Sequence, residues 1–401
     1  MSVYVINMHN LKQFFSQMEA YFDNSATTKA LDSVRDIMVK TLTEDFGNPS
    51  AKHTKGMEAE NYIRQAAADI AKTLKVKDKE ILFTSGGTES NNMALIGTAL
   101  ANQRAGKHII STRIEHASVY QPLAFLESLG FEVTYLHVDH NGHISLEELE
   151  QSIRPDTILV SVMYVNNEIG AIEPIDEIAR LVHGKNPKIV FHVDAIQAYG
   201  KLVIRPKKQG IDLLSVSGHK IHGPKGIGFL YIDEKVKIRP LIYGGGQQKD
   251  MRSGTENVPG IAGLGVAAKE MYTDHSAKME YLTGLKDYLI DRASELEGVT
   301  VNSLKGAEGA PQIVSLSFEG VRSEVLLHAL EEKGIYVSSG SACSSNHPAI
   351  SGTLKAIGVK KELLDSTLRF SFGMFNKKEE IDYAVDVLKE LLPVLRRFTI
   401  K

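Results

Sequence analysis

Residues 181–226, LVHGKNPKIVFHVDAIQAYGKLVIRPKKQGIDLLSVSGHKIHGPKG, contain two apolar runs that each end in polar residues. The first run, 188–193, ends at Asp194, and the second, 211–216, ends at Ser217-Gly218-His219-Lys220. In parallel α/β sheets, ligands bind beyond the carboxyl ends of the strands. We therefore expect both runs to deliver their polar groups to one edge of a sheet.

Lys220 and Asp194 together suggest a cofactor site. A lysine just past a buried strand, among Ser, His and Gly, is a candidate amine for a Schiff base. An aspartate at the end of the preceding strand could keep a pyridinium nitrogen protonated, and the two together are the arrangement that pyridoxal phosphate (PLP) requires. Taken singly, Lys220 could instead be a solvated loop lysine and Asp194 a helix cap.

Composition describes an ordinary globular protein. The chain has 401 residues, 43% hydrophobic and 24% charged, with a net charge of −3, which gives no reason to expect direct binding to nucleic acid. No apolar run reaches the ~20 residues of a membrane span, and the start lacks the order of a signal peptide. We expect a cytoplasmic protein without a membrane partner. Its single cysteine, Cys343, excludes an intramolecular disulfide and a cysteine-based metal site, and no metal is expected.

Strand and helix patterns alternate along most of the chain. This order predicts an α/β fold with a mainly parallel sheet and helices on both faces. After about residue 275 the elements restart on a shorter scale, which indicates a second, smaller α+β domain. We predict an N-terminal arm at 1–30 that joins the small domain, a large domain at 31–275, and a small domain at 276–401 that carries the cysteine loop. The predicted helices include 31–43, 57–74, 89–100, 118–129, 258–272 and 379–397; the predicted strands include 81–83, 108–111, 131–136, 157–165, 227–232, 313–318 and 367–372.

Other polar groups follow the predicted strands. Ser85-Gly86-Gly87-Thr88 forms a glycine turn before a helix, where free backbone N–H groups can bind one phosphate. His116 could lie against a planar ring or be hydrogen-bonded at a strand end. Asn167 could donate to a ring oxygen or shape a turn. Near the start, Ser25, Thr27 and Thr28 could cap a helix or face the active site.

Two residues near the C-terminus indicate a reactive thiol and an anion site. Cys343 lies in the polar run SSGSACSSNHP, which favours an accessible thiol over a buried one. Arg369 lies within the strand pattern TLRFSF, where an inward arginine needs an anion such as a carboxylate. It could equally face outward on an edge strand.

These stretches together resemble the PLP-dependent cysteine desulfurases of the NifS/IscS type, in the class V aminotransferase group of fold type I. The resemblance extends from Tyr21 to about Arg397. It is carried by the motifs DNSATT, FGNPS, TSGGTESNN, EHASV, VNNEIG, HVDAIQ, SGHKIHGPKG, GGGQQKDMRSGTENV, SSGSAC and LRFSFG. It implies a large domain with a mainly parallel seven-stranded sheet, and a homodimer.

The resemblance also implies a role for each site residue. Lys220 would carry the PLP, Cys343 would accept the sulfur and His116 would stack on the ring. Arg369, with Asn167, would hold the substrate. The remaining implied contacts are Asp194 on the pyridine nitrogen, Gln197 and Asn167 near the ring hydroxyl, and Gly87, Thr88, Ser217, His219 and the second subunit's Thr255 on the phosphate.

The implied reaction removes sulfur from L-cysteine, giving L-alanine and a persulfide on Cys343. The sulfur would go to an acceptor protein for iron–sulfur cluster assembly or tRNA thiolation. The SSGSAC loop resembles the first desulfurase group, whereas the residues before Met18 and the short tail leave the acceptor open. The alternatives are a selenocysteine lyase or an aminotransferase on the same scaffold. A PLP-binding protein without activity would have no use for Lys220, Cys343 and Arg369 together.

Overall fold

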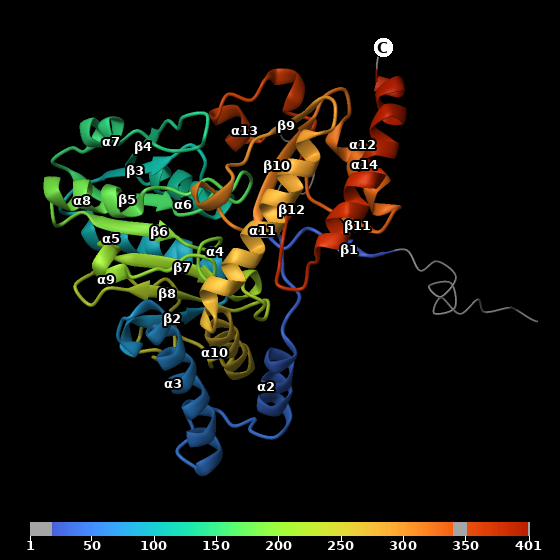
Figure 1. Ribbon diagram of the computed structural model, residues 1–401. Coiled ribbons are helices and arrows are strands. Elements are labelled where there is room, and N and C mark those ends of the chain that lie inside the picture. Colours follow the sequence, from blue (N-terminus) through green and yellow to red (C-terminus); the bar gives the residue numbers. More distant parts are fainter. Residues whose placement is uncertain (1–17, 340–350, 400–401) are drawn as a thin grey trace, which may run out of the picture.

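The computed structural model describes residues 18–339 and 351–399, and its main feature is a seven-stranded sheet (Figure 1). β8 is antiparallel to both of its neighbours, so the other six strands all run in one direction. The predicted α/β class and the mainly parallel sheet are confirmed. In spatial order the strands are β2 (Ile81–Thr84), β8 (Gly228–Ile232), β7 (Leu213–Ser217), β6 (Val190–Asp194), β5 (Thr157–Met163), β3 (His108–Thr112) and β4 (Glu132–Leu136).

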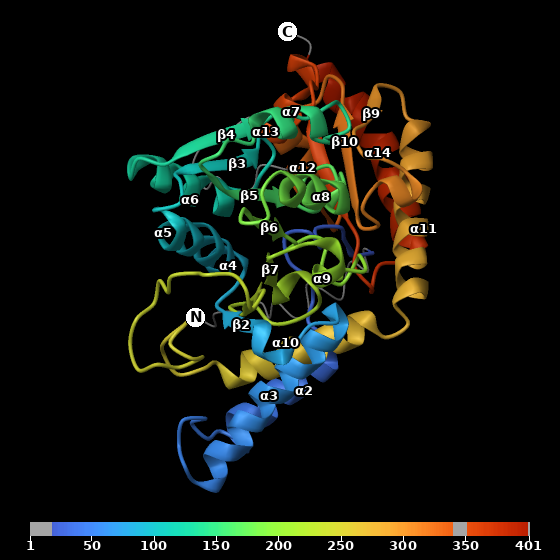
Figure 2. The same ribbon diagram turned by 90° about the vertical axis from the view of Figure 1, so that its left-hand side faces the viewer.

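The middle of this sheet is buried on both faces. Every residue of β5, β6 and β7 is buried, because helices cover the two faces of the sheet (Figures 1 and 2). Each face of the sheet has its own apolar core. Successive side chains of a strand point to opposite faces and so contribute to the two cores in turn. The helices of this part are α2 (Asp32–Thr43), α3 (Thr54–Leu74), α4 (Gly87–Asn92), α5 (Thr98–Asn102), α6 (Ala117–Ser128), α7 (Leu146–Ser152), α8 (Ile175–Lys185), α9 (Pro206–Gln209) and α10 (Val258–Tyr272).

A smaller unit with its own core follows α10. It contains a three-stranded antiparallel sheet in the order β12-β10-β9 and a parallel pair of strands, β1 and β11. The N-terminal strand thus joins this unit, and Phe22 packs edge-on against Phe372 at 5.5 Å. The domain bounds at residues 30 and 275 stay a prediction. The elements are β1 (Ala20–Tyr21), α11 (His275–Ser294), β9 (Val299–Val301), β10 (Ile313–Phe318), α12 (Ser323–Glu331), β11 (Ile335–Tyr336), α13 (Gly352–Ala356), β12 (Thr367–Ser371) and α14 (Lys378–Thr399).

Two local features differ from the prediction. The expected helix at 89–100 starts earlier and is interrupted by a π-helical turn, Met93–Gly97. At its end, a Cβ on Gly97 would lie 2.6 Å from the Ile238 side chain, so only glycine fits there. The helix α8 was not predicted, although its buried Ile175, Ile178 and Val182 have helical spacing.

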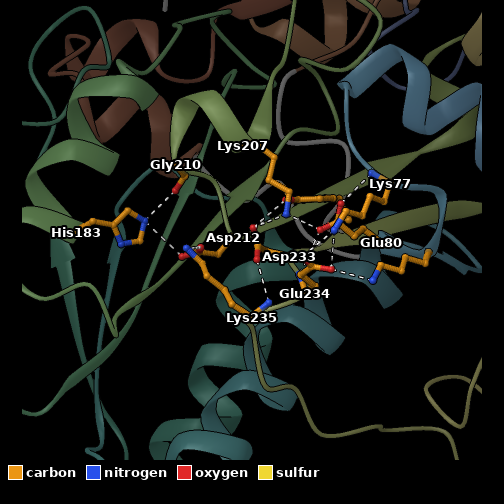
Figure 3. Close-up of polar contacts among 11 residues, drawn as sticks. Lys77, Glu80, His183, Lys207, Gly210, Asp212, Asp233, Glu234 and Lys235 are labelled. Atoms are coloured by element: carbon orange, nitrogen blue, oxygen red, sulfur yellow. Dashed lines mark hydrogen bonds and ion pairs between the residues drawn. The ribbon is translucent and has the colours of Figure 1, made fainter.

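Ion pairs fasten the end of the sheet opposite to Ser217 (Figure 3). Lys207 Nζ lies 2.5 Å from Glu80 Oε1 and 2.8 Å from Asp233 Oδ2. Asp212, which precedes β7, pairs with Lys235 at 2.9 Å and accepts a hydrogen bond from the backbone of β6. These contacts hold β6, β7 and β8 together at this end. The strands are therefore fixed relative to one another, and so are the polar side chains at their other end.

Within the described residues, no helix is both long and apolar enough to cross a bilayer.

Candidate active site

A cavity of about 330 Å³ opens at the carboxyl edge of the sheet, where the sequence predicts the polar groups to meet. The structure therefore brings together nine of the ten predicted cofactor residues, and Arg369 with them. Its lining consists of Ser25, Ala26, Gly87, Thr88, His116, Ser118, Met163, Val165, Asn167, Asp194, Ile196, Gln197, Ser217, His219, Lys220 and Arg369.

Asp194 is the acidic group of the cavity. It ends β6 and is 4% exposed. Its Oδ1 accepts from the Ile196 N–H at 3.0 Å and its Oδ2 from Asn91 Nδ2 at 2.8 Å. Burial raises the pKa of the carboxyl, and the hydrogen bonds and the charges of His116 and Lys220 oppose that effect. A buried carboxylate held by two neutral donors is suited to a cationic ring nitrogen.

Lys220 lies across the cavity on a 3₁₀ turn, Gly218–Lys220, directly after β7. Its Nζ donates to the backbone oxygens of Ser25 at 2.5 Å and Ala26 at 2.7 Å. The amine is therefore held inside the site by the segment after β1, and the alternative of a solvated loop lysine is wrong.

The glycine turn before α4 forms the anion end of the cavity. A Cβ on Gly87 would lie 2.2 Å from Ile196 Cδ1, so a larger residue would fit only if the Ile196 side chain moved. Ser217 and His219 face the same space from β7 and the turn after it. Burial, and then the charge of Lys220, lower the pKa of His219 to about 4. A neutral His219 can donate one hydrogen bond to a phosphate without adding charge.

His116 is hydrogen-bonded, as one of its two sequence interpretations predicts, and its place against a planar ring stays a prediction. It is the N-cap of α6, where Nδ1 accepts from the Ser118 N–H at 3.0 Å, and its ring also lines the cavity. Ser118 Oγ in turn accepts from Asn91 Nδ2 at 2.9 Å. A hydrogen-bonded path thus joins His116 to Asp194 through Ser118 and Asn91. Asn91 was not predicted; its place one helical turn after Gly87 in TSGGTESNN is the signal that could have identified it.

Arg369 faces inward from β12 and is 6% exposed, which excludes the outward orientation. Its Nη1 donates to Asn167 O at 2.8 Å and its Nη2 to Asp23 Oδ1 at 2.9 Å. The third nitrogen, Nε, is buried without a hydrogen-bond partner in the described chain. Asp23 was not predicted, and it holds the guanidinium at the cavity wall.

The hydroxyl residues after β1 do not cap α2. The N-cap of α2 is Leu31, which forms no side-chain cap bond. Ser25 lines the cavity, and Thr28 donates from Oγ1 to His219 O at 2.9 Å. Thr27 Oγ1 lies 3.2 Å from His219 Nδ1. Ser25 therefore faces the active site, and Thr27 and Thr28 position the turn that carries Lys220.

Thr255 and Cys343 are the two predicted site residues that the cavity does not include. Thr255 is exposed on the long loop between β8 and α10, yellow in Figure 2, outside the cavity lining. Arg252 holds this loop to Glu89 of α4 at 3.0 Å. Cys343 lies outside the described residues. On either side of it, Ser338 pairs with the backbone of Arg369, and Ser351 donates to Glu168 Oε2 at 2.5 Å, so both flanks lie near the cavity.

The residues present fit pyridoxal phosphate. A flat ring needs a wall such as His116, an acid at its nitrogen and an amine at its aldehyde. Asp194 and Lys220 supply the last two groups. The glycine turn, with Thr88 beside it, can hold the phosphate. The buried Oγ of Ser25 and Oδ1 of Asn91 have no hydrogen-bond partner among residues 18–339 and 351–399, and they are further polar atoms next to this site.

Comparison with known proteins gives a consistent result. Residues 20–384 match the family model described as aminotransferase class-V. The chain is 44% identical over 379 residues to "Cysteine desulfurase IscS" of Dictyoglomus turgidum, covering 94% of this chain and 95% of the relative. It is 45% identical over 379 residues to the protein of the same name from Methanosarcina thermophila, covering 94% and 93%. The solved structure titled "NIFS-LIKE PROTEIN" superposes with a TM-score of 0.89 at 38% identity, covering 94% of this chain and 100% of that one. "SspA in complex with cysteine" superposes with a TM-score of 0.79 at 36% identity, covering 89% and 100%.

Proposed function

This chain belongs to the aminotransferase class-V family and is a cysteine desulfurase, and we propose that it converts L-cysteine to L-alanine with the sulfur left as a persulfide on Cys343. The observation that carries the proposal is the meeting of three groups in one cavity: the Lys220 amine, the buried Asp194 carboxylate and the Arg369 guanidinium. In balance, L-cysteine and the Cys343 thiol give L-alanine and the Cys343 persulfide.

PLP is the cofactor we propose; bound here, it withdraws electrons from the substrate Cα. Asp194 would keep the ring nitrogen protonated, and Asn167 and Gln197, which line the same cavity, would bind the ring hydroxyl. Lys220 would hold the cofactor by its aldehyde, and its amine, when free, would act as the base for the Cα proton. The backbone oxygens of Ser25 and Ala26 keep that amine within the cavity.

Arg369 would bind the substrate carboxylate, since its buried Nε has no hydrogen-bond partner in the described chain and its other nitrogens are anchored. We expect Arg369→Lys to raise the KM for L-cysteine by about tenfold or more, because a lysine amine cannot replace a planar guanidinium that is anchored to Asn167 and Asp23 and still offers Nε to the substrate. Asp23→Asn, which weakens only the anchor, should raise KM less. Steady-state kinetics, with the cofactor absorbance as a check on loading, measure both. Unchanged KM in Arg369→Lys would contradict this role.

We also propose a homodimer in which Thr255 binds the phosphate of the partner's site. The exposed position of Thr255 on a loop outside its own cavity supports this arrangement. Thr255→Ala should weaken PLP binding about tenfold, the loss of one hydrogen bond to a charged group. Equilibrium dialysis gives the affinity and light scattering the mass of the assembly. The neighbouring Asn257 caps α10, so Asn257→Ala is a control for local destabilisation of this segment without loss of Thr255. Equal affinities in Thr255→Ala and wild type would remove the cross-subunit role.

The persulfide needs an acceptor, which we propose is a protein of iron–sulfur cluster assembly or of tRNA thiolation. The chain's single cysteine allows no internal disulfide that could release the sulfur. We place the activity in the cytoplasm, where thiols are kept reduced.

The products made from L-cysteine test the proposed function. We expect L-alanine and, with a thiol reductant present, an equal amount of sulfide. An aminotransferase would instead give a keto acid that retains the sulfur. A strict selenocysteine lyase would leave L-cysteine unchanged and release selenide from L-selenocysteine. Either result would replace the proposal by that alternative.

A further inference from the structure

A buried lysine, Lys201, lies next to the backbone of Lys220. β6 ends at Asp194, and the turn after it contains Gln197 and leads to Lys201. Lys201 is 6% exposed. Its Nζ donates a hydrogen bond to the backbone oxygen of Lys220. The two lysines are therefore neighbours beyond the carboxyl ends of β6 and β7, with Lys201 buried and Lys220 half-buried at the cavity.

The charges around Lys201 are unusual for a buried lysine. Within residues 18–339 and 351–399, the charged group that acts on it is Lys220, and burial together with this neighbour lowers the pKa of Lys201 to about 7. The imidazoles that face it are His219, His222 and His275, and burial is the main cause that lowers the pKa of each. These rings are thus neutral at neutral pH. Asp194 is an acidic residue near the two lysines, and its electrostatic interaction is with Lys220.

A comparison with Lys286 shows that a structural role does not require this arrangement. Lys286 is also fully buried, and its Nζ donates to the backbone oxygens of Gly306 at 2.7 Å and Gly309 at 3.2 Å. It has an acid beside it, since Asp287 Oδ1 lies 3.8 Å away. Lys201 instead has another amine as its charged neighbour. Burying a lysine amine in that setting costs free energy of folding. Burying a methionine, which could fill the same space, would not have this cost.

We propose that Lys201 is a positioning residue that keeps the Lys220 amine in its unprotonated form. The inference rests on the proposed function of Lys220. Two neighbouring amines each disfavour a proton on the other, so they titrate as a coupled pair. A proton on Lys201 therefore disfavours one on Lys220. An unprotonated Lys220 is the form that can attach to an aldehyde and take a proton from Cα.

The test is a pH titration of the visible absorbance of the PLP-loaded enzyme, which follows protonation of the linkage between Lys220 and the cofactor. We expect Lys201→Met to raise the apparent pKa of that transition by about one pH unit, because a neighbouring positive charge is removed. Lys201→Arg, with its permanent charge, should give an apparent pKa at or below that of the wild type. The matched control is Lys286→Met, which removes a buried lysine elsewhere. It should lower the melting temperature and leave the transition where it is.

Each outcome has a distinct meaning. An unchanged apparent pKa in folded Lys201→Met, or an equal rise in Lys201→Arg, overturns the role of the charge. If Lys201→Met does not retain PLP, the same comparison is made on cofactor-free proteins by the pH dependence of Lys220 acetylation, read by peptide mass. There too an unchanged pKa overturns the inference. A wild type that shows no absorbance linked to Lys220 would instead contradict the proposed function itself.

Discussion

Lys220→Ala is expected to fold normally, to hold PLP without a covalent bond and to lose at least about a thousandfold in alanine formation. The loss combines the missing attachment point with the missing base, and general bases and nucleophiles each contribute effects of this order. Lys220 is the amine that lines the cavity, held by the oxygens of Ser25 and Ala26. Borohydride reduction followed by intact-protein mass gives the covalent attachment directly, and amino-acid analysis gives the rate.

The control for this variant is another lysine of the same segment. Lys225 is exposed five residues further along SGHKIHGPKG. Lys225→Ala should keep the reducible PLP adduct and nearly all of the activity. An adduct that persists in Lys220→Ala would place the Schiff base on another lysine. Peptide mapping of the reduced protein would then identify that lysine.

Site residues that directly follow strands could be predicted from the sequence. Residues that hydrogen-bond to those site residues could not. Asp194, Ser217, His219 and Lys220 stand directly at the ends of apolar runs, so the rule for parallel sheets was sufficient to bring them to one edge. The turn at Gly87 was recognisable for the same reason. The order of strands and the single reversed strand, β8, came only from the structure, because local patterns carry no information on which strands pair.

The supporting residues depend on contacts between distant segments. Asn91 reaches Asp194 across 103 positions of the chain, and Asp23 reaches Arg369 across 346. A short polar side chain in a loop or on a helix has many possible partners, so sequence pattern alone could not select these. Lys201 is a sharper case. It looks like a surface lysine in YGKLV, and only the folded chain shows it buried against the backbone of Lys220.

Cys343→Ala is expected to keep PLP bound through Lys220 but to gain no sulfur from L-cysteine, with alanine formation lowered by about a thousandfold or more, as for the loss of other catalytic nucleophiles. The chain has one cysteine, so any sulfur added to the wild type and absent from the variant must be on Cys343. The measurement is intact mass after brief exposure of the reduced, PLP-loaded protein to L-cysteine. Cys343→Ser is the matched control for size, since its hydroxyl is too weak a nucleophile to replace the thiolate.

The same variant can separate substrate activation in the cavity from sulfur transfer to Cys343. In the proposed roles, Lys220, Asp194 and Arg369 bind and activate the substrate without Cys343, so we expect Cys343→Ala still to exchange the Cα proton of L-cysteine with deuterated water. Exchange without sulfur gain would show that the cavity acts before the thiol does. An unaltered rate of alanine formation in Cys343→Ala would contradict the persulfide, because sulfur would then leave by a path that needs no nucleophile from this chain. Loss of both exchange and sulfur gain would place Cys343 in substrate activation as well as in sulfur transfer.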